Sequence, residues 1–274
     1  MIIAGFIGTL QVQGQTYGNG ALTNSGCTAT GSLGSCTNTY IGSSAGAAVT
    51  ANSTNNTFIG ASAGAGNKDT KNNTAVGFSA LALQNVASSI STYNTAVGDS
   101  SLYTNAPTGT GGTGQYNTAI GSSSGFKNST GQGGLFGGYL AGYYTTTAAY
   151  SVMLGFKAGY SNTTGSNNIC IGADAGYYNQ TGTRNTIVGY LAGFGNGSVN
   201  SYNDNSFFGW KAGGLITAGV SNSFFGKEAG YTNSSASNNC FFGYQTGYTT
   251  STGASNFFGG YQAGYLSTTC DSAV

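Results

Sequence analysis

One unit of about seventeen residues recurs along most of this chain. Each copy reads Asn, a Thr-like residue, two apolar residues and Gly, followed three residues later by Ala, a second Gly and often Tyr. The first glycines are Gly42, Gly60, Gly77, Gly98, Gly121, Gly138, Gly155, Gly172, Gly189, Gly209, Gly226, Gly243 and Gly260. Eight of the twelve steps between them are 17 residues long, and the longer steps gain their residues in the linker after the Tyr. Such a period is typical of a repeat architecture with one corner that tolerates insertions.

The repeat predicts an all-β fold, a parallel β-solenoid or β-roll of about 13 coils. Seventeen residues are too few for a helix pair and too many for one strand, and Phe, Ile, Val, Tyr and Thr fill the repeat in place of helix formers. In a solenoid each copy makes one turn, and equivalent residues stack roughly 4.7–4.9 Å apart. We expect residues 38–265 to form the solenoid, residues 1–37 a cap or junction, and residues 266–274 a C-terminal tail.

An asparagine precedes the apolar residues in most copies, and we predict that it forms a structural ladder. Amide side chains stacked one coil apart can hydrogen-bond to one another, and Asn also tolerates the left-handed backbone of a corner. A structural role is therefore favoured over a ligand-binding role. The predicted ladder comprises Asn38, Asn56, Asn73, Asn94, Asn117, Asn168, Asn185, Asn205, Asn222, Asn239 and Asn256.

The two glycines and the alanine of the repeat predict tight backbone geometry. Each glycine indicates either a positive φ or a close approach of a neighbouring coil. Leu81 and Leu102 replace the second glycine, so glycine is less strictly required at that position. The recurrent Ala indicates room for one methyl group.

The two adjacent apolar residues predict an aromatic stripe on the surface. Neighbouring strand residues point to opposite faces, so Phe207 and Phe208 cannot both fill one core. The outward residue and the recurrent tyrosines would form an exposed apolar surface. We expect lateral association of chains, most simply as a trimer, to shield this surface from water. The alternative is a monomeric rod whose loops fold over the stripe. The predicted association stripe comprises Phe207, Phe224, Phe241, Tyr160, Tyr177, Tyr231, Tyr248 and Tyr265.

The scarcity of ionisable residues argues against catalysis and against several classes of ligand. The 274 residues include 6 acidic and 7 basic residues and no His, so we assign no catalytic, cofactor-binding or metal-binding residues. A net charge of +1 without a basic run argues against nucleic acid as a partner. No apolar run approaches the roughly 18 residues of a membrane-spanning helix. The 19 Tyr and 15 Phe argue against disorder.

The five cysteines suggest two environments. Cys27 and Cys36 lie nine residues apart in a loop-like segment and are candidates for a local disulfide in an oxidising compartment; two free thiols are the alternative. Cys170 and Cys240 occupy apolar positions of the repeat, where we expect them to be buried and reduced.

Several copies resemble a known family of surface proteins. The segments 94–101 (Asn-Thr-Ala-Val-Gly-Asp-Ser-Ser) and 117–124 (Asn-Thr-Ala-Ile-Gly-Ser-Ser-Ser) resemble head repeats of trimeric autotransporter adhesins. The longer form, of the NxxFIGYxAGY type, resembles tandem repeats of surface proteins and of phage tail-fibre-like proteins. The resemblance spans about residues 38–265, and the adhesin family implies a left-handed parallel β-roll that associates as a trimer.

Three non-enzymatic functions fit these features. The first is a structural or adhesive protein of an extracellular or cell-surface fibre, whose partners are copies of itself, in a trimer or an end-to-end filament, and a host surface or glycan. The second is a phage tail fibre that binds a receptor. The third is an ice-binding solenoid, because Thr39, Thr57, Thr74 and three later threonines share one repeat position. A solenoid enzyme is disfavoured because the six acidic residues fall at scattered repeat positions.

Overall fold

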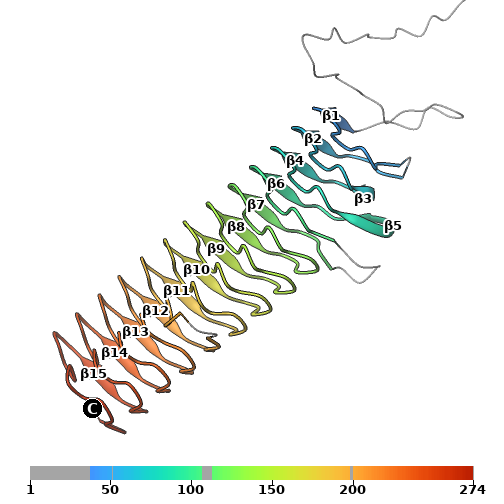
Figure 1. Cartoon of the computed structure of the whole chain (residues 1–274). Helices are drawn as coiled ribbons and strands as arrows, with labels where there is room; N and C mark the ends of the chain where they lie inside the picture. Colours follow the sequence, from blue (N-terminus) through green and yellow to red (C-terminus); the bar gives the residue numbers. More distant parts are fainter. Residues whose placement is uncertain (1–37, 51, 107–112, 198–199, 274) are drawn as a thin grey trace, which may run out of the picture.

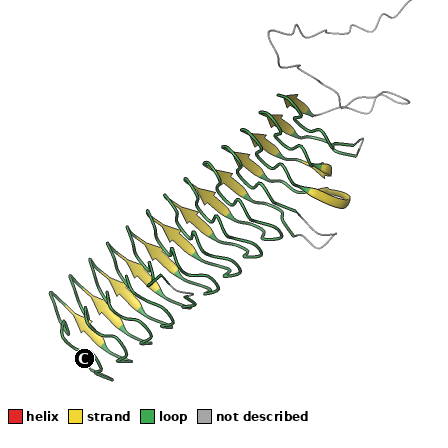
Figure 2. Ribbon diagram, in the orientation of Figure 1, coloured by secondary structure: helices red, strands yellow, loops and turns green. Residues whose placement is uncertain are grey.

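The computed structural model describes residues 38–50, 52–106, 113–197 and 200–273. Within these ranges the chain winds into a rod of stacked coils and contains no helix (Figure 1, Figure 2). Each coil adds one strand to a single 13-stranded sheet, in the order β1-β2-β4-β6-β7-β8-β9-β10-β11-β12-β13-β14-β15. Neighbouring strands of this sheet are parallel. The predicted all-β parallel solenoid is confirmed.

Every strand of the main sheet is three residues long, and equivalent residues of successive copies face each other. Phe207 pairs with Phe224, and Phe224 with Phe241, with ring centroids 5.1 and 4.9 Å apart. This in-register stacking confirms the predicted ladder of equivalent residues. The strands are β1 (Thr39–Ile41), β2 (Thr57–Ile59), β4 (Thr74–Val76), β6 (Thr95–Val97), β7 (Thr118–Ile120), β8 (Leu135–Gly137), β9 (Val152–Leu154), β10 (Ile169–Ile171), β11 (Thr186–Val188), β12 (Ser206–Phe208), β13 (Ser223–Phe225), β14 (Cys240–Phe242) and β15 (Phe257–Gly259).

A second, two-stranded parallel sheet lies on the side of the rod away from the main sheet (Figure 1). It consists of β3 (Lys68–Lys71) and β5 (Asn85–Ser91). Strand β5 belongs to a copy that is 21 residues long, and the added residues fall in the linker after the second glycine position. The tolerant corner predicted from the sequence is therefore placed opposite the main sheet.

The middle residue of each strand points into the coil and forms the core, while the first and third residues face outward. Burial alternates in this way along β2, β9 and β12, whose middle residues are almost completely inaccessible to solvent. The recurrent alanines are also buried, in agreement with the single methyl group predicted there. Inward strand residues of the core are Tyr40, Phe58, Ala75, Ala96, Ala119, Phe136, Met153, Cys170, Ile187, Phe207, Phe224 and Phe241.

Beside the inward residues Ala75 and Ala96, a leucine at the second glycine position fills the core, whereas beside Ala119 this position is Gly125 and the space is filled by Leu102 and Phe136 of the adjoining coils. In the coil of β2, Phe58 fills the interior, and a Cβ built at Gly64 would lie 2.5 Å from its ring. In the next coil Ala75 replaces the phenylalanine and Leu81 replaces the glycine, and both are fully buried. Leu81 keeps the left-handed backbone, with φ at 53°. Glycine is therefore not strictly required at this position, because a leucine there can fill the volume that a phenylalanine ring fills in the preceding coil.

The first glycine of the repeat is required by both backbone conformation and close packing. Gly226 has a φ of +138°, and a Cβ built on it would lie 2.2 Å from the carbonyl oxygen of Gly243 in the next coil. Side chains rarely adopt this backbone conformation, and backbone atoms cannot move aside easily. The corner where each strand ends therefore admits glycine alone.

The solenoid extends beyond the boundary at residue 265 that the sequence suggested. Asn256 Nδ2 donates to the carbonyl oxygen of Cys270 at 2.6 Å, and the backbone N–H of Ala273 donates to Asn256 Oδ1 at 2.9 Å. These are the bonds that equivalent residues make in the other coils, so residues 266–273 continue the winding. The predicted cap, residues 1–37, lies outside the described residues.

Candidate functional site

The predicted asparagine ladder lies inside the rod, beside the start of the strands. Asn222 Oδ1 accepts the backbone N–H of Asn239 at 3.0 Å, while its Nδ2 donates to Ala236 O at 2.9 Å and to Asn205 Oδ1 at 3.1 Å. The left-handed φ lies at the preceding residue, as at Ser221 with 59°. The predicted amide ladder is therefore present. The prediction that the asparagines themselves adopt the left-handed backbone conformation is wrong. Buried members are Asn56, Asn73, Asn94, Asn117, Asn168, Asn185, Asn205, Asn222, Asn239 and Asn256.

Three members of the predicted association stripe lie in the core. Phe207, Phe224 and Phe241 are fully buried, so they cannot contact another chain and their assignment to the stripe is wrong. The physical reason is the phase of the three-residue strand, which turns its middle residue inward and its first and third residues outward. The neighbouring residues stack on the outer face instead, with centroids 4.9 and 4.8 Å apart: Phe208, Phe225 and Phe242.

The outer face of the main sheet carries two columns of uncharged side chains. The third strand position holds only Ile, Val, Leu, Phe or Gly in all thirteen strands. Its members include Ile120, which is 52 % exposed, and Phe242, which is 43 % exposed. The first strand position holds threonine on the five strands from β1 to β7 in the main sheet and is mostly apolar on β8 to β10. This face is the longest apolar surface that the strands present to solvent.

The tyrosines of the predicted stripe stack on one another after the second glycine of each coil. Tyr160 and Tyr177 lie 4.9 Å apart, and Tyr248 lies 5.1 Å from Tyr231 and 4.9 Å from Tyr265. Burial, followed by a hydrogen bond with a neighbouring tyrosine, raises the pKa of Tyr160 to about 12. Each ring covers the face of the next, so these tyrosines already receive from their own chain part of the cover that we expected from a partner. This Tyr ladder also includes Tyr103, Phe126, Tyr143 and Phe194.

A second column of rings stands one residue after the first glycine, and lysines are interleaved with it. Tyr190 and Trp210 lie 6.5 Å apart. In the next coil Lys227 takes the place of a ring, with Nζ 4.8 Å from the centroid of Trp210 and 5.5 Å from that of Tyr244. Lys211 adds a second cation at 4.3 Å from Trp210. This cation–π arrangement was not predicted from the sequence, because it depends on side chains from three coils.

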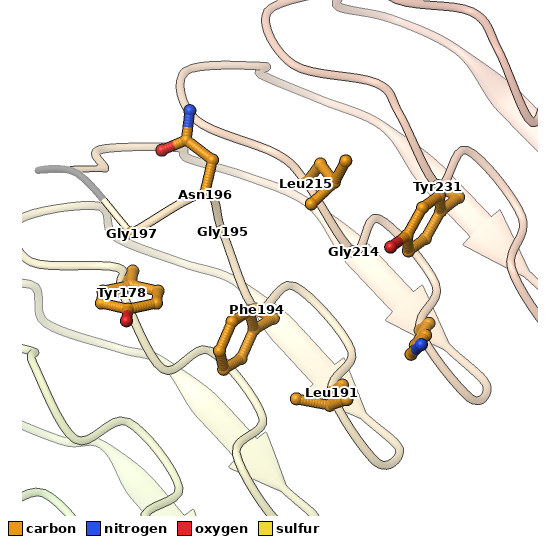
Figure 3. A pocket seen from close by; sticks show the side chains of 10 residues that line it. Tyr178, Leu191, Phe194, Gly195, Asn196, Gly197, Gly214, Leu215 and Tyr231 are labelled. Carbon is orange, nitrogen blue, oxygen red and sulfur yellow. The ribbon is translucent and has the colours of Figure 1, made fainter.

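The Tyr ladder is interrupted once, and a pocket opens there. Gly214 occupies the rung between Phe194 and Tyr231. The pocket has a volume of about 500 Å³, and the two rings line it on either side of the glycine (Figure 3). Leu215 and Lys211 also line it. This site was not predicted, although the sequence contains a signal for it: Gly214 is the single non-aromatic residue at this repeat position between Tyr103 and Tyr265.

Charged side chains are dispersed over the described part of the rod. Arg184 and Asp204 form the ion pair found there, with Nε–Oδ1 at 2.6 Å and Nη2–Oδ2 at 2.8 Å. The hydrogen bond from Arg184 lowers the pKa of Asp204 below its usual range. Within the described ranges no group of three His, Cys, Asp or Glu side chains is placed to hold a metal ion. The same ranges contain no helix suited to crossing a membrane.

The described cysteines occupy different environments. Cys170 is buried in the core as expected, and burial raises the pKa of its thiol to about 12. Cys240 is only half-buried, because it lies at the first position of β14 and faces outward, so the expectation of burial is wrong for it. Both are free thiols, as is the exposed Cys270. The candidate disulfide between Cys27 and Cys36 lies outside the described residues.

Comparison with known proteins identifies no relative: no protein-family model matches the sequence, and no curated protein and no solved structure is significantly similar to it. The resemblance to adhesin head repeats and to fibre-like tandem repeats therefore stays a prediction.

Proposed function

We propose that this protein is a non-enzymatic structural subunit of an extracellular fibre, in which copies associate laterally through the outer face of the main sheet. The observation that carries the proposal is the apolar column at the third strand position of that face, which holds Ile, Val, Leu or Phe on eleven of the thirteen strands and is interrupted by Gly137 and Gly259. A partly exposed ladder of this kind is more continuous than the scattered apolar residues of an ordinary monomer. Burying it against a second copy removes this surface from water.

The dimensions of the face suit an interface between copies. Thirteen strands spaced roughly 4.8 Å apart and three residues wide give a flat area of roughly 600 Å². Side chains that project from this area increase it toward the roughly 800 Å² per partner of a standard interface. Neither column of the face contains a charged residue, so close approach of two copies would bury no unpaired charge.

Replacing Phe225 with Arg tests this proposal. Phe225 points outward from the middle of the apolar column, so Phe225→Arg introduces a charge into the interface without altering the core. We expect wild-type protein to form trimers or larger species by analytical ultracentrifugation at micromolar concentration, and the variant to dissociate toward monomer. Ser235→Arg adds the same charge on an exposed turn and should associate like wild type. A monomeric wild type, or a variant that associates equally well, would contradict the proposal.

Five threonines in register favour ice binding as a second candidate function. Thr39, Thr57, Thr74, Thr95 and Thr118 face one another across β1, β2, β4, β6 and β7, beside a column of Ile and Val. They present hydroxyl and methyl groups at one fixed spacing on a flat, uncharged surface. Thermal hysteresis that is lost in Thr74→Lys and retained in Thr252→Lys, an exposed threonine on a turn, would support it. Wild-type protein without hysteresis would exclude this function.

A further inference from the structure

The pocket at Gly214 exposes ring faces that the rest of the Tyr ladder hides. Within the ladder each ring is stacked on both sides, as Tyr160 is between Tyr143 at 5.6 Å and Tyr177 at 4.9 Å. Phe194 has a ladder neighbour on one side only, at 5.3 Å, and so has Tyr231, at 5.1 Å. Gly214 supplies no ring between them, so the two rings face each other across the interruption (Figure 3).

The interruption leaves a pocket large enough for one small ring. Two neighbouring steps of a parallel sheet span roughly 9.5 Å, and Tyr231 takes up part of this interval. Tyr231 leans over Gly214, because a Cβ built on the glycine would lie 2.7 Å from its Cδ2 and Cε2. The remaining pocket of about 500 Å³ is within the usual range for small-molecule sites. Leu191 and Leu215 close its apolar lining (Figure 3).

The polar lining of the pocket favours an anion with hydrogen-bonding groups. Lys211 lines the pocket, with Nζ 5.9 Å from the Tyr231 centroid and 4.3 Å from Trp210. Among the described residues, no carboxylate lies within ion-pair distance of this ammonium group. Aromatic contacts do not neutralise its charge, so the pocket attracts an anionic ligand. Tyr178, Tyr231 and Asn196 also line the pocket.

We infer that this pocket binds the pyranose ring of an acidic sugar, with the carboxylate placed toward Lys211. A pyranose combines the features that the pocket matches: two faces of C–H groups that pack on aromatic rings, a rim of hydroxyls for the polar groups, and a negative charge for the lysine. A neutral sugar lacks the charge. An aromatic acid has the flat ring and the charge but lacks the rim of hydroxyls. The inference is independent of self-association through the sheet.

The test is binding of a glucuronate-containing disaccharide, measured by isothermal titration calorimetry on the full chain. We expect saturable binding, with the corresponding neutral glucose disaccharide and phenylacetate each weaker by about tenfold, the effect of one lost charge-assisted contact. Lys211→Gln should weaken binding of the acidic disaccharide by a similar factor. Lys157→Gln is the matched control, because Lys157 occupies the same repeat position and lies over Phe156, away from the pocket.

The variant Gly214→Tyr distinguishes loss of binding through a filled pocket from loss of binding through misfolding. Tyrosine is the residue that other coils carry at this position, so the variant should fill the pocket and abolish binding once the Tyr231 ring moves aside. The variant should keep a thermal midpoint near that of wild type, which shows that the fold is intact. Its self-association should match wild type, which distinguishes failure of this inference from failure of the fibre proposal. Absence of saturable binding, binding that survives Gly214→Tyr, or equal binding of the neutral disaccharide or phenylacetate would overturn the inference.

Discussion

Buried asparagine side chains join neighbouring coils at the corner where the backbone enters the strand. At Asn222 one amide accepts a backbone N–H from the next coil and donates to a carbonyl there and to the amide of the preceding coil. These groups are shielded from water, so each needs a protein partner. The ladder therefore satisfies, coil after coil, backbone groups that the three-residue strands cannot reach.

Replacing Asn222 with Leu should destabilise the protein strongly. The change keeps the approximate volume but leaves the N–H of Asn239 and the carbonyl of Ala236 without partners inside the rod. Each unsatisfied buried group costs about 1–3 kcal/mol, so we expect a loss of about 2–5 kcal/mol. Urea denaturation followed by circular dichroism measures it. Ser235→Leu, at an exposed position in the linker, should change the midpoint far less; equal effects would contradict a structural ladder.

The exchange of volume between Ala75 and Leu81 predicts coupled substitutions. Ala75→Phe alone should overpack the coil, and Leu81→Gly alone should leave a cavity, so each lowers the free energy of unfolding. The double variant reproduces the Phe58 and Gly64 combination of the preceding coil and should recover much of the loss. A double-mutant cycle in urea should give a coupling of about 1–3 kcal/mol. Additive effects would show that the two sites are independent.

The element that defines the architecture is the short strand with a glycine corner at its end. Three residues suffice for one inward and two outward side chains, and the close approach at Gly226 sets the spacing to the next coil. The linker on the opposite side also has close glycine contacts, as at Gly182, where a Cβ would lie 2.0 Å from Tyr202 O, but the copies differ in linker length, and one lengthened linker contributes β5. Strand and linker thus differ sharply in how much change they tolerate.

An insertion should therefore be tolerated in the linker and not at the corner. Gly-Ser-Gly placed between Ser234 and Ser235 lengthens a loop whose added entropy costs less than about 1 kcal/mol. The same insertion between Gly243 and Tyr244 displaces the glycine contact and the hydrogen bonds that join the coils. We expect thermal melts near wild type for the first variant and loss of the cooperative transition for the second. Similar melts for both would contradict the assignment of the tolerant corner.

On the scale of the whole molecule, one face of the rod changes character along its length. Threonines fill the first strand position from β1 to β7 of the main sheet, whereas phenylalanines fill the third position from β12 to β14. The interior changes as well, from stacked Tyr40 and Phe58 through alanines beside leucines to stacked phenylalanines. The chemistry of this surface therefore differs between the two ends of the rod.

The stability of the rod should fall at alkaline pH. Burial raises the pKa of Tyr40 and of the Cys170 thiol to about 12, and that of Tyr202 above its ordinary value. The folded state then holds these protons at a pH where the unfolded chain has released them, so the free energy of unfolding decreases as pH rises beyond about 9 to 10. We expect a lower urea midpoint at pH 11 than at pH 8. Tyr202→Phe should reduce this pH-dependent difference; midpoints that are equal at the two pH values would contradict the prediction.

The sequence by itself determined the period, the parallel stacking, the asparagine ladder and the corner that accepts insertions. Each of these follows from identity between copies, because residues that recur at one position must meet one another in a solenoid. The tertiary structure alone decided which of two adjacent apolar residues faces inward. Alternation places Phe224 and Phe225 on opposite faces but does not say which face is the core. The pocket at Gly214 also required the structure, because a missing ring becomes a site only when rings of the two adjoining coils face it.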